Sequence, residues 1–487
     1  MCHTYLVQVT RAPKGARIAL SKSASRHSRS RGVAGAAVVA VAFVRAALLV
    51  SLVAVVTFVG SPSLAQSSAP RPLPDYDGRG PPKTTPRDVV LWIPRVGFAP
   101  LYVVSEYVIR RPLGAAVVYA EKSRIPQKLV DFFTFDKAHS IGIIPTAFVD
   151  FGVLPSVGVY FFWDKFLAGD NNLRLRAATW GPKWLSFGLT DRLKLNDRAT
   201  LSLNVDWTRR QDWLFYGLGP LSKTSAQSRY SATIFDASMK VDQAVTRVLR
   251  VHSVVGFRDT RFQDGQCCGD PTVRERVVAS ELVLPPGFAE GYAIGYQLLG
   301  ISFDTRANRP APQNGVRIEV EGQPAFNVKS SPGNAWVRYG GSVGGFVDLT
   351  GTNRVLSLAL SAQFADPFGG GTIPWNEQVV LGGKQLLRGF RQGRLVDRSA
   401  LVATLQYQWP VWAWLDGTLH VAMGNVFAPR LSDFATKLLR LSSGVGLRTS
   451  NSPDTQFEAI LGFATDTYSE GLRPSSVRLS LGATHGF

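Results

Sequence analysis

Cysteine and histidine, the residues most often found in catalytic and metal sites, are scarce in this chain of 487 residues. It contains three cysteines and six histidines. No histidine stands beside a nucleophile motif such as G-x-S-x-G, which a hydrolase or acyltransferase would need. Histidines and cysteines at the spacing of metal ligands are missing, and so is a glycine-rich loop that cradles phosphate. The sequence therefore predicts a protein that is not an enzyme, with no metal, no other cofactor and no small-molecule substrate.

Hydrophobic residues make up 45% of the chain and the mean hydropathy is +0.04, too low for a bundle of membrane-spanning helices. Apolar and polar residues instead alternate in segments such as 201–207, 401–409 and 477–487. A strand with one face in lipid and one in water has this period of two, and Trp207 and Trp409 suit the headgroup level. The pattern predicts a transmembrane β-barrel, with a large soluble all-β protein as the alternative.

Acidic residues are absent from residues 1–65, which contain eight lysines and arginines. An apolar run at 46–60 follows this basic lead, and the small residues Ser63 and Ala65 come next. The order predicts a signal peptide at residues 1–65, cleaved after Ala65, with an uncleaved membrane anchor as the alternative. The lead is unusually long, so the sequence leaves the true start codon open.

The formal net charge of the whole chain is +19, and without the eight charges of the signal peptide it is 19 − 8 = +11. The remaining cations are scattered and no nucleic-acid module is visible, so nucleic acid is not expected as a partner. Cations such as Arg174 and Arg176, which alternate with leucines, are expected to line a lumen or to meet phosphates. Outer-membrane lipids and lipopolysaccharide are therefore predicted partners.

Cys2 lies in the signal peptide, which leaves the adjacent pair Cys267 and Cys268 in a polar loop. An exported compartment favours oxidation, so this pair can form a vicinal disulfide. The sequence leaves their redox state open, and two cysteines without nearby histidines make a weak metal site. No cysteine follows the cleavage site, so a lipid anchor is not expected there.

Two segments precede the predicted strands. Residues 66–87 are rich in serine, proline and charge, which predicts a disordered linker in the periplasm. Residues 88–137 have helical spacing, and Pro100 and Pro112 can each open a short helix. Such helices would lie on the membrane at the barrel mouth, plug the lumen or cap the barrel, and the sequence does not decide among these positions.

Residues 138–487 are predicted to form an all-β fold, a transmembrane antiparallel barrel of about 16 strands in the bacterial outer membrane. An even strand number, with short periplasmic turns and long outer loops in alternation, is typical of such barrels. Residues 366–399 fall on the long side as the sixth outer loop. The predicted strands are 139–151, 154–163, 172–180, 183–192, 199–209, 228–241, 246–259, 293–305, 316–326, 334–349, 354–365, 400–412, 416–428, 439–450, 455–466 and 476–487.

The sixth loop contains GGKQLLRGFRQGR at 382–394, which resembles a loop of the BamA/TamA outer-membrane assembly family, also called the bacterial surface antigen family. FYGLGPLS at 215–222, GISFDTR at 300–306 and SGVGLR at 443–448 resemble further segments of that family. The resemblance covers roughly residues 141–487. It implies a barrel whose sixth loop folds back into the lumen.

The resemblance also implies which residues form the loop motif. These are Gly382, Gly383, Leu387, Arg388, Gly389 and Phe390. In the family the arginine, here Arg388, contacts lumen-facing acids, and a guanidinium fork suits the pinning of a long loop. Positions where the family often has those acids hold Gln406 and Ala422 here, which predicts an uncharged or relocated contact. The candidate acceptors for Arg388 are Gln406, Glu319, Glu321 and Asp397.

Assembly factors of that family carry periplasmic repeat domains that capture client strands. Residues 66–137 lack the strand and helix order of such a repeat, so a barrel-only member is predicted. The first and last strands would meet at a seam that Gly482 and Gly486 weaken, although these glycines could equally relieve crowding. Phe487 at the C-terminus is interpreted as the assembly signal of the barrel itself.

The leading functional prediction is insertion or translocation of proteins at the outer membrane, through a lateral seam and the inward-folded sixth loop. Client outer-membrane proteins would then be partners. A passive pore or a lipid or polysaccharide conduit is the alternative. The sequence does not identify the client, nor any partner protein.

Overall fold

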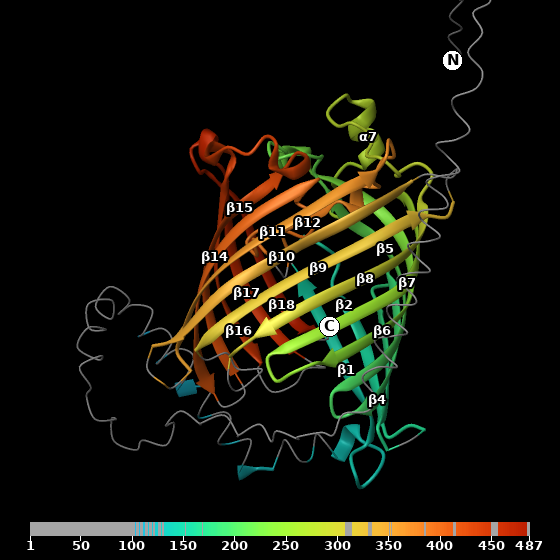
Figure 1. Ribbon diagram of the computed structural model, residues 1–487, viewed down its shortest axis with the longest axis vertical. Helices are drawn as coiled ribbons and strands as arrows, with labels where there is room; N and C mark the ends of the chain where they lie inside the picture. The colour runs from blue at the N-terminus through green and yellow to red at the C-terminus, as the bar shows by residue number, and fades with distance from the viewer. Residues whose placement is uncertain are drawn as a thin grey trace, which may run out of the picture.

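The computed structural model describes residues 131–150, 152–167, 169–306, 314–329, 334–349, 353–383, 386–412, 415–449 and 456–484, with residue 351 and isolated positions between 103 and 128. These residues form a closed antiparallel barrel of 16 strands (Figure 1). Strands adjacent in sequence pair with each other, and β1 pairs with β18 to close the ring. The predicted fold class is confirmed.

The strands agree closely with the alternating segments of the sequence. They are β1 Ile141–Asp150, β2 Ser156–Asp164, β3 Asn171–Thr179, β4 Leu185–Asn196, β5 Ala199–Phe215, β6 Ser228–Ala244, β7 Leu249–Asp264, β8 Tyr292–Asp304, β9 Gly315–Asn327, β10 Ala335–Asp348, β11 Val355–Phe368, β14 Ser399–Trp412, β15 Leu415–Phe427, β16 Arg440–Thr449, β17 Gln456–Thr467 and β18 Pro474–Thr484. Two further strands, β12 Val379–Leu381 and β13 Leu395–Asp397, form a separate hairpin between β11 and β14.

Short helical elements occur in the connections between strands. They are α7 Val273–Val278, η2 Thr224–Ala226, η3 Trp375–Glu377, η4 Pro429–Leu431, η5 Thr436–Leu438 and η6 Tyr468–Glu470. Helix α7 begins at a capping box, in which the Thr272 hydroxyl accepts from the Glu275 N–H and the Glu275 carboxylate accepts from the Thr272 N–H. Within the described residues, no helix has the length and apolar character needed to cross a membrane.

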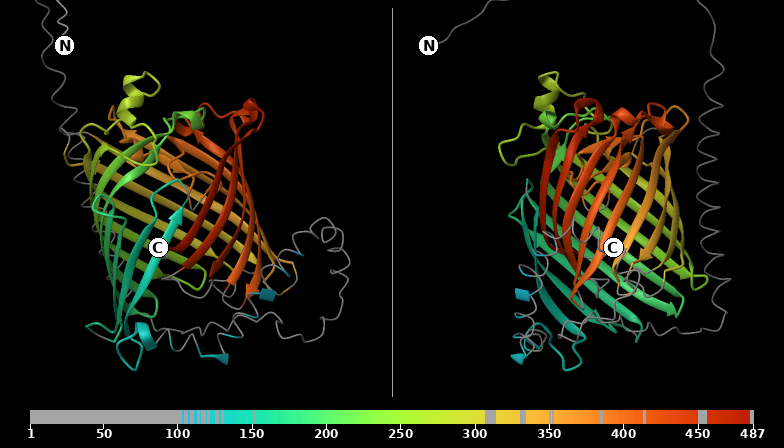
Figure 2. Two further views of the ribbon diagram at one scale, coloured as in Figure 1. Left: turned by 180° about the vertical axis from the view of Figure 1, so that it is seen from behind. Right: turned by 90° about the vertical axis from the view of Figure 1, so that its left-hand side faces the viewer.

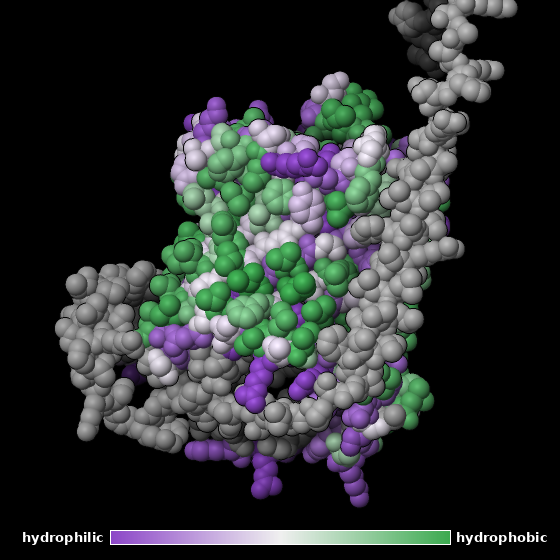
Figure 3. All heavy atoms as spheres, viewed as in Figure 1, coloured by the Kyte–Doolittle hydropathy of each residue, from purple (hydrophilic) through white to green (hydrophobic). Residues whose placement is uncertain are grey.

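The two faces of each strand differ in character. Outward positions carry exposed apolar side chains, among them Val320 at 58% and Leu358 at 62% exposure, and Figure 3 shows such hydrophobic side chains across the middle of one side of the barrel. Inward positions include buried ionic groups such as Arg229, Arg440 and Arg478. An apolar exterior around a polar interior is the arrangement that a lipid bilayer requires of a barrel.

Connections at the two ends of the barrel differ in length. At one end β4 stops at Asn196 and β5 starts at Ala199, whereas at the other end residues 265–291 join β7 to β8 and residues 369–398 join β11 to β14. Long loops face the cell exterior in such barrels, so the second end is extracellular. It is the upper end in Figure 1.

Aromatic side chains fill the lumen near the extracellular end. Trp375 packs edge-on against Tyr230, with 5.0 Å between ring centroids, and against Phe215, with 4.9 Å. Phe262 stacks on Phe288 at 5.5 Å. These rings come from barrel strands and from two loops, so the packing draws the loops into the lumen.

Several predictions fall on the N-terminal part of the chain. The signal peptide at 1–65 and the linker at 66–87 lie outside the described residues, as does most of the helical segment at 88–137. Close to the barrel, the Phe135 N–H donates to the Ile141 carbonyl at 2.8 Å. No periplasmic repeat domain is present in the described residues.

Candidate functional site

Loop 6, residues 369–398, enters the lumen and is held there by its own hairpin and by one buried acid. Strands β12 and β13 pair at three positions, and Leu381, Leu395 and Val396 are at most 1% exposed. Glu377, also 1% exposed, accepts from Arg258 of β7 at 3.0 Å and from the Tyr292 hydroxyl at 2.8 Å. The base of loop 6 is therefore fixed to the inner wall by apolar packing and by a charge-assisted contact.

The tip of loop 6 is described at residues 382, 383 and 386–390, where the chain turns tightly. Gly382 and Gly383 have φ values of 102° and 85°, a region that glycine enters without steric cost. Leu387 also has a positive φ, 53°, and its carbonyl accepts from the Phe390 N–H at 2.9 Å. Phe390 is fully buried and its carbonyl accepts from the Gly383 N–H, also at 2.9 Å. The motif residues thus shape the tip and anchor it.

Gly389 lies directly against the barrel wall. Its N–H donates to Ser442 Oγ of β16 at 2.8 Å, and its carbonyl accepts from Ser476 Oγ of β18 at 3.0 Å. A Cβ at this position would stand 2.1 Å from the Phe463 carbonyl oxygen of β17. A side chain is therefore sterically excluded, and the glycine lets the tip backbone touch three neighbouring strands.

Arg388 points toward an acid on β17. Its Nη1 lies 3.9 Å from Glu458 Oε1, and the two side chains are 19% and 16% exposed. Glu458 was not among the four acceptors that the sequence predicted. The contact is a relocated ion pair at the outer limit of ion-pair distance, so charge attraction rather than a fork of short hydrogen bonds holds it.

Within the described residues, none of the four predicted acceptors forms a hydrogen bond or an ion pair with Arg388. Gln406 of β14 stands opposite His420 of β15, and Glu319 pairs with Arg317 on the same strand. Glu321 of β9 stands opposite Gly340 of β10. Asp397 accepts from the Arg398 N–H at 2.7 Å at the base of loop 6, where burial raises its pKa to about 6.

A second motif of the sequence meets loop 6. The segment 215–222 runs from the end of β5 into the next loop, and its Gly219 N–H donates to the Val396 carbonyl at 2.9 Å. Arg394 of loop 6, 2% exposed, donates to both the hydroxyl and the carbonyl of Ser222 at 2.8 Å. Burial, followed by the nearby Arg440, lowers the pKa of Arg394 to about 10. Segment 215–222 and loop 6 therefore pack against each other, a contact that the sequence did not reveal because the two segments lie far apart in the chain.

The seam between β1 and β18 is short. It has three paired positions in the described residues, against eight for β1 with β2 and ten for β17 with β18. Figure 2 shows the blue-green first strand meeting the red last strands toward the extracellular end and diverging from them below. Pro145 removes a donor from β1, which sheets tolerate at edge strands. Within the described residues, strand pairing in the barrel is therefore least extensive here.

Gly482 lies at this seam, opposite Phe148. A Cβ on Gly482 would stand 2.7 Å from the Phe148 ring and 2.8 Å from the Ala147 carbonyl oxygen. The glycine thus permits close approach of the two strands, and its role in weakening the seam stays a prediction. Gly486 and Phe487 lie outside the described residues.

One guanidinium joins the seam to loop 6. Arg478 of β18, 1% exposed, donates to the Asp150 carboxylate of β1 through Nε and through Nη2, the latter at 2.7 Å. Its Nη1 donates to the Gly383 carbonyl at 2.8 Å and to the Arg388 carbonyl at 3.4 Å. We call these four contacts the Arg478 clasp. The sequence did not single out Arg478 or Asp150.

Sequence comparison places this architecture in a family. A family model described as the Omp85 superfamily domain matches residues 173–484, well over half of the chain. The chain belongs to the Omp85 superfamily. Barrels of this superfamily are in general non-enzymatic transport and assembly proteins, and the predicted location in the bacterial outer membrane is confirmed. No curated protein sequence matches.

This Omp85 barrel is similar to solved structures of outer-membrane proteins. BamA from Haemophilus ducreyi lacking POTRA domains 1–3 has a TM-score of 0.50 and 16% identity, over 71% of this chain and 70% of that chain. CdiB from Acinetobacter baumannii has a TM-score of 0.44 and 12% identity, over 70% of this chain and 59% of that chain. At 16% identity the likeness to BamA concerns the fold alone.

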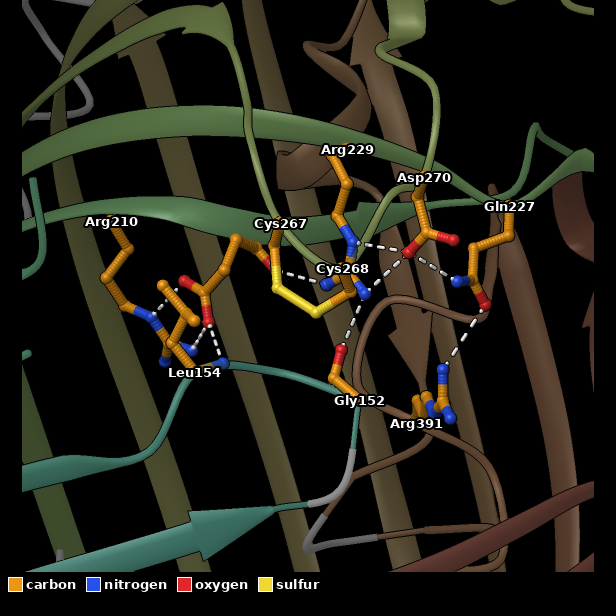
Figure 4. Close-up of a disulfide and its surroundings, with 10 residues drawn as sticks. Gly152, Leu154, Arg210, Gln227, Arg229, Cys267, Cys268, Asp270 and Arg391 are labelled. Atoms are coloured by element: carbon orange, nitrogen blue, oxygen red, sulfur yellow. Dashed lines mark hydrogen bonds and ion pairs between the residues drawn. A yellow bond between two sulfur atoms is a disulfide. The ribbon is translucent and has the colours of Figure 1, made fainter.

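A second ionic network in this Omp85 barrel fastens the extracellular end of β1 (Figure 4). Arg229 of β6, 1% exposed, donates to the Gly152 carbonyl at 2.6 Å and to Asp270 at 2.8 Å. Gln227 donates to the same Asp270 and accepts from Arg391 of loop 6 at 3.3 Å. The network links the β1–β2 connection, the β7–β8 loop and loop 6.

Cys267 and Cys268 form a disulfide within this region. The Cys267 carbonyl accepts from the Asp270 N–H at 3.1 Å, so the cysteine pair is part of the turn that presents Asp270 to Arg229. In the part of the chain that the structure describes, no three histidine, cysteine, aspartate or glutamate side chains form a group suited to a metal ion.

Proposed function

We propose that this Omp85 barrel inserts or translocates proteins at the outer membrane by opening the seam between β1 and β18, with loop 6 controlling the opening. The observation that carries the proposal is the Arg478 clasp, which joins β1, β18 and the loop 6 tip through one buried side chain. A separated seam would expose strand edges, and an exposed edge can template an incoming strand.

The short seam supports the proposal energetically. Each lost ladder hydrogen bond costs about 0.5–1.5 kcal/mol, so separation of three described pairs needs far less free energy than rupture of the ten-pair interface between β17 and β18. The Arg478 clasp adds a charge-assisted contact at the same place. The clasp thus keeps the seam closed at rest, and once the clasp is released the seam is the line with the fewest strand pairs along which the barrel can part.

Planar-bilayer recording separates this function from a passive pore. Loop 6 and the aromatic cluster around Trp375 fill the extracellular part of the lumen. We therefore expect the reconstituted protein to show low conductance with brief openings. A large, steady, anion-selective current would contradict the proposal and favour the pore, since arginines line the lumen.

A disulfide across the seam is expected to abolish activity in cells. Val149 and Leu481 are paired across β1 and β18, so the double variant Val149→Cys/Leu481→Cys would bridge the seam on oxidation. After depletion of the native protein, this variant should fail to restore the outer-membrane proteome unless a reductant is added. Quantitative mass spectrometry of outer-membrane fractions measures the loss of client barrels.

The matched control bridges the other edge of β18. Ala459 and Leu481 are paired between β17 and β18, so Ala459→Cys/Leu481→Cys uses the same position on the last strand but spares the seam. It should restore the proteome under oxidising conditions. Equal activity of the two oxidised variants, or an unchanged proteome after depletion with altered lipid or solute traffic, would refute protein insertion through the seam.

A further inference from the structure

The outer wall of β5 to β8 carries a hollow that loop 6 and the seam do not explain. Its volume is about 600 Å³. The lining residues are Trp207, Thr233, Phe235, Phe257, Asp259, Arg261, Ala293, Val328 and Lys329. Arg258 of β7, next to Phe257, pairs in the lumen with Asp236 of β6, next to Phe235, and with Glu377 of loop 6. The alternate positions 235, 257, 259 and 261 therefore face outward.

Cations and aromatic rings occupy different levels of this wall. Strand register places Arg209, Thr233 and Arg261 side by side in one row. The next row toward the periplasm places Trp207 beside Phe235, which stands beside Asp259. Phe257 lies one further row below, and Phe235 and Phe257 are 36% and 41% exposed. The hollow thus has a basic upper edge and aromatic walls.

The row that contains Arg209, Thr233 and Arg261 lies at the extracellular boundary of the apolar band. Arg209 pairs with Leu185, the first residue of β4 at its extracellular end. From Leu201 to Arg209 the strand rises eight residues, about 26 Å along the strand at ~3.3 Å per residue and roughly 20 Å along the barrel axis at a tilt of ~40°, which spans most of an apolar band ~25 Å tall. Below the row, outward residues of β5 are apolar. The cations are therefore level with the headgroups of the outer leaflet.

The charges at this edge favour an anion. Asp259 pairs with Lys329 and, at 3.0 Å, with Nε of Arg261. The lining holds two cations and one acid, 2 − 1 = +1, and Arg209 beside Thr233 adds a third cation at the edge of the hollow. The Arg261 side chain is 72% exposed, although it is paired. A phosphate ester could bind these guanidinium and ammonium groups while an acyl chain lies along the rings below.

We propose that this hollow binds an acylated, phosphorylated sugar headgroup of the outer leaflet, that is, a lipid of the lipid A class. Arg261 and Lys329 contact a phosphate, and Trp207, Phe235 and Phe257 pack against an acyl chain. A phospholipid has one phosphate and a smaller headgroup, so it matches the row of separated cations less well. The site is independent of the proposed seam function.

Binding of lipid A to the full-length protein in detergent tests the proposal. Arg261→Gln/Lys329→Gln should weaken the binding at least tenfold, which corresponds to the loss of about one charge-assisted contact. Asp259→Asn should instead tighten it several-fold, because the acid no longer competes with the phosphate. Lys194→Gln/Arg192→Gln, with the same loss of charge toward the periplasmic end of β4, serves as the matched control and should leave binding unchanged.

Three further ligands decide the identity of the occupant. Lipid A from which the phosphates have been removed should bind at least tenfold more weakly, and phosphatidylglycerol should bind more weakly than lipid A. Inorganic phosphate should not displace lipid A at millimolar concentration. Equal binding of dephosphorylated lipid A, equal binding of phosphatidylglycerol, displacement by phosphate, or unchanged binding in the Arg261 and Lys329 double variant would each overturn the site.

Discussion

Replacing Arg478 with methionine is expected to open the seam and to destabilise the barrel by about 3–5 kcal/mol, the usual cost of removing one partner from a buried ion pair. The change leaves the Asp150 carboxylate, whose side chain is 13% exposed, without its guanidinium. It also removes the donor to the Gly383 carbonyl. Spin labels at Val149 and Leu481 measure the seam distance, and unfolding in urea measures the stability.

A pair of the same chemistry away from the seam provides the control. Arg176 of β3 contacts Asp206 of β5 at 2.7 Å inside a continuous part of the sheet. Arg176→Met should lower stability without broadening the distance between the two labels. Arg478→Lys keeps the charge but not the fork, so it should recover part of the closure. An unchanged seam distance in Arg478→Met would contradict the clasp.

Replacing Gly389 with alanine is expected to displace the tip of loop 6 from the wall. The added methyl group would meet the Phe463 carbonyl oxygen at 2.1 Å, and neither backbone can move without breaking the contacts with Ser442 and Ser476. Overpacking of this kind costs about 1–3 kcal/mol. Proteolysis of loop 6 in the folded barrel should accelerate, and the conductance should rise as the lumen clears.

Gly370 gives the matched control in the same loop. A Cβ there meets no atom within 4 Å, so Gly370→Ala should match the parent protein in proteolysis and conductance. Both variants should keep the heat-dependent shift in electrophoretic mobility that reports a closed barrel. If Gly389→Ala behaves like Gly370→Ala, then tight docking of the tip is not what holds loop 6.

The strands could be predicted because lipid imposes a period of two on each of them. The prediction fails where the lipid ends. The sequence predicted that β5 ends at residue 209, but the strand continues to Phe215. The prediction stopped too early because Arg210 and Asp212 lie above the apolar band, where the alternation of apolar and polar residues no longer marks an outer face. The β12–β13 hairpin was missed for the same reason, since both of its strands lie in the lumen.

The contacts of the candidate site depend on ring closure, which a single sequence does not reveal. Asp150 and Arg478 lie 328 residues apart and meet because the last strand returns to the first. The resemblance to a family directed attention to acids on the first two strands after loop 6. The tip instead reaches β16, β17 and β18, and the acid near Arg388 is Glu458 on β17.

The anchoring of β1 sets the direction in which the barrel can part. Beyond its extracellular end, the Gly152 carbonyl is bound by Arg229 and the Leu154 N–H by Asp212, and the described seam pairs occupy the same end of the strand. Separation of β1 from β18 is therefore expected to begin at the periplasmic end of the seam, while the extracellular end of β1 stays bound. Under the proposed function, a client protein that arrives from the periplasm would first meet the periplasmic end of β1.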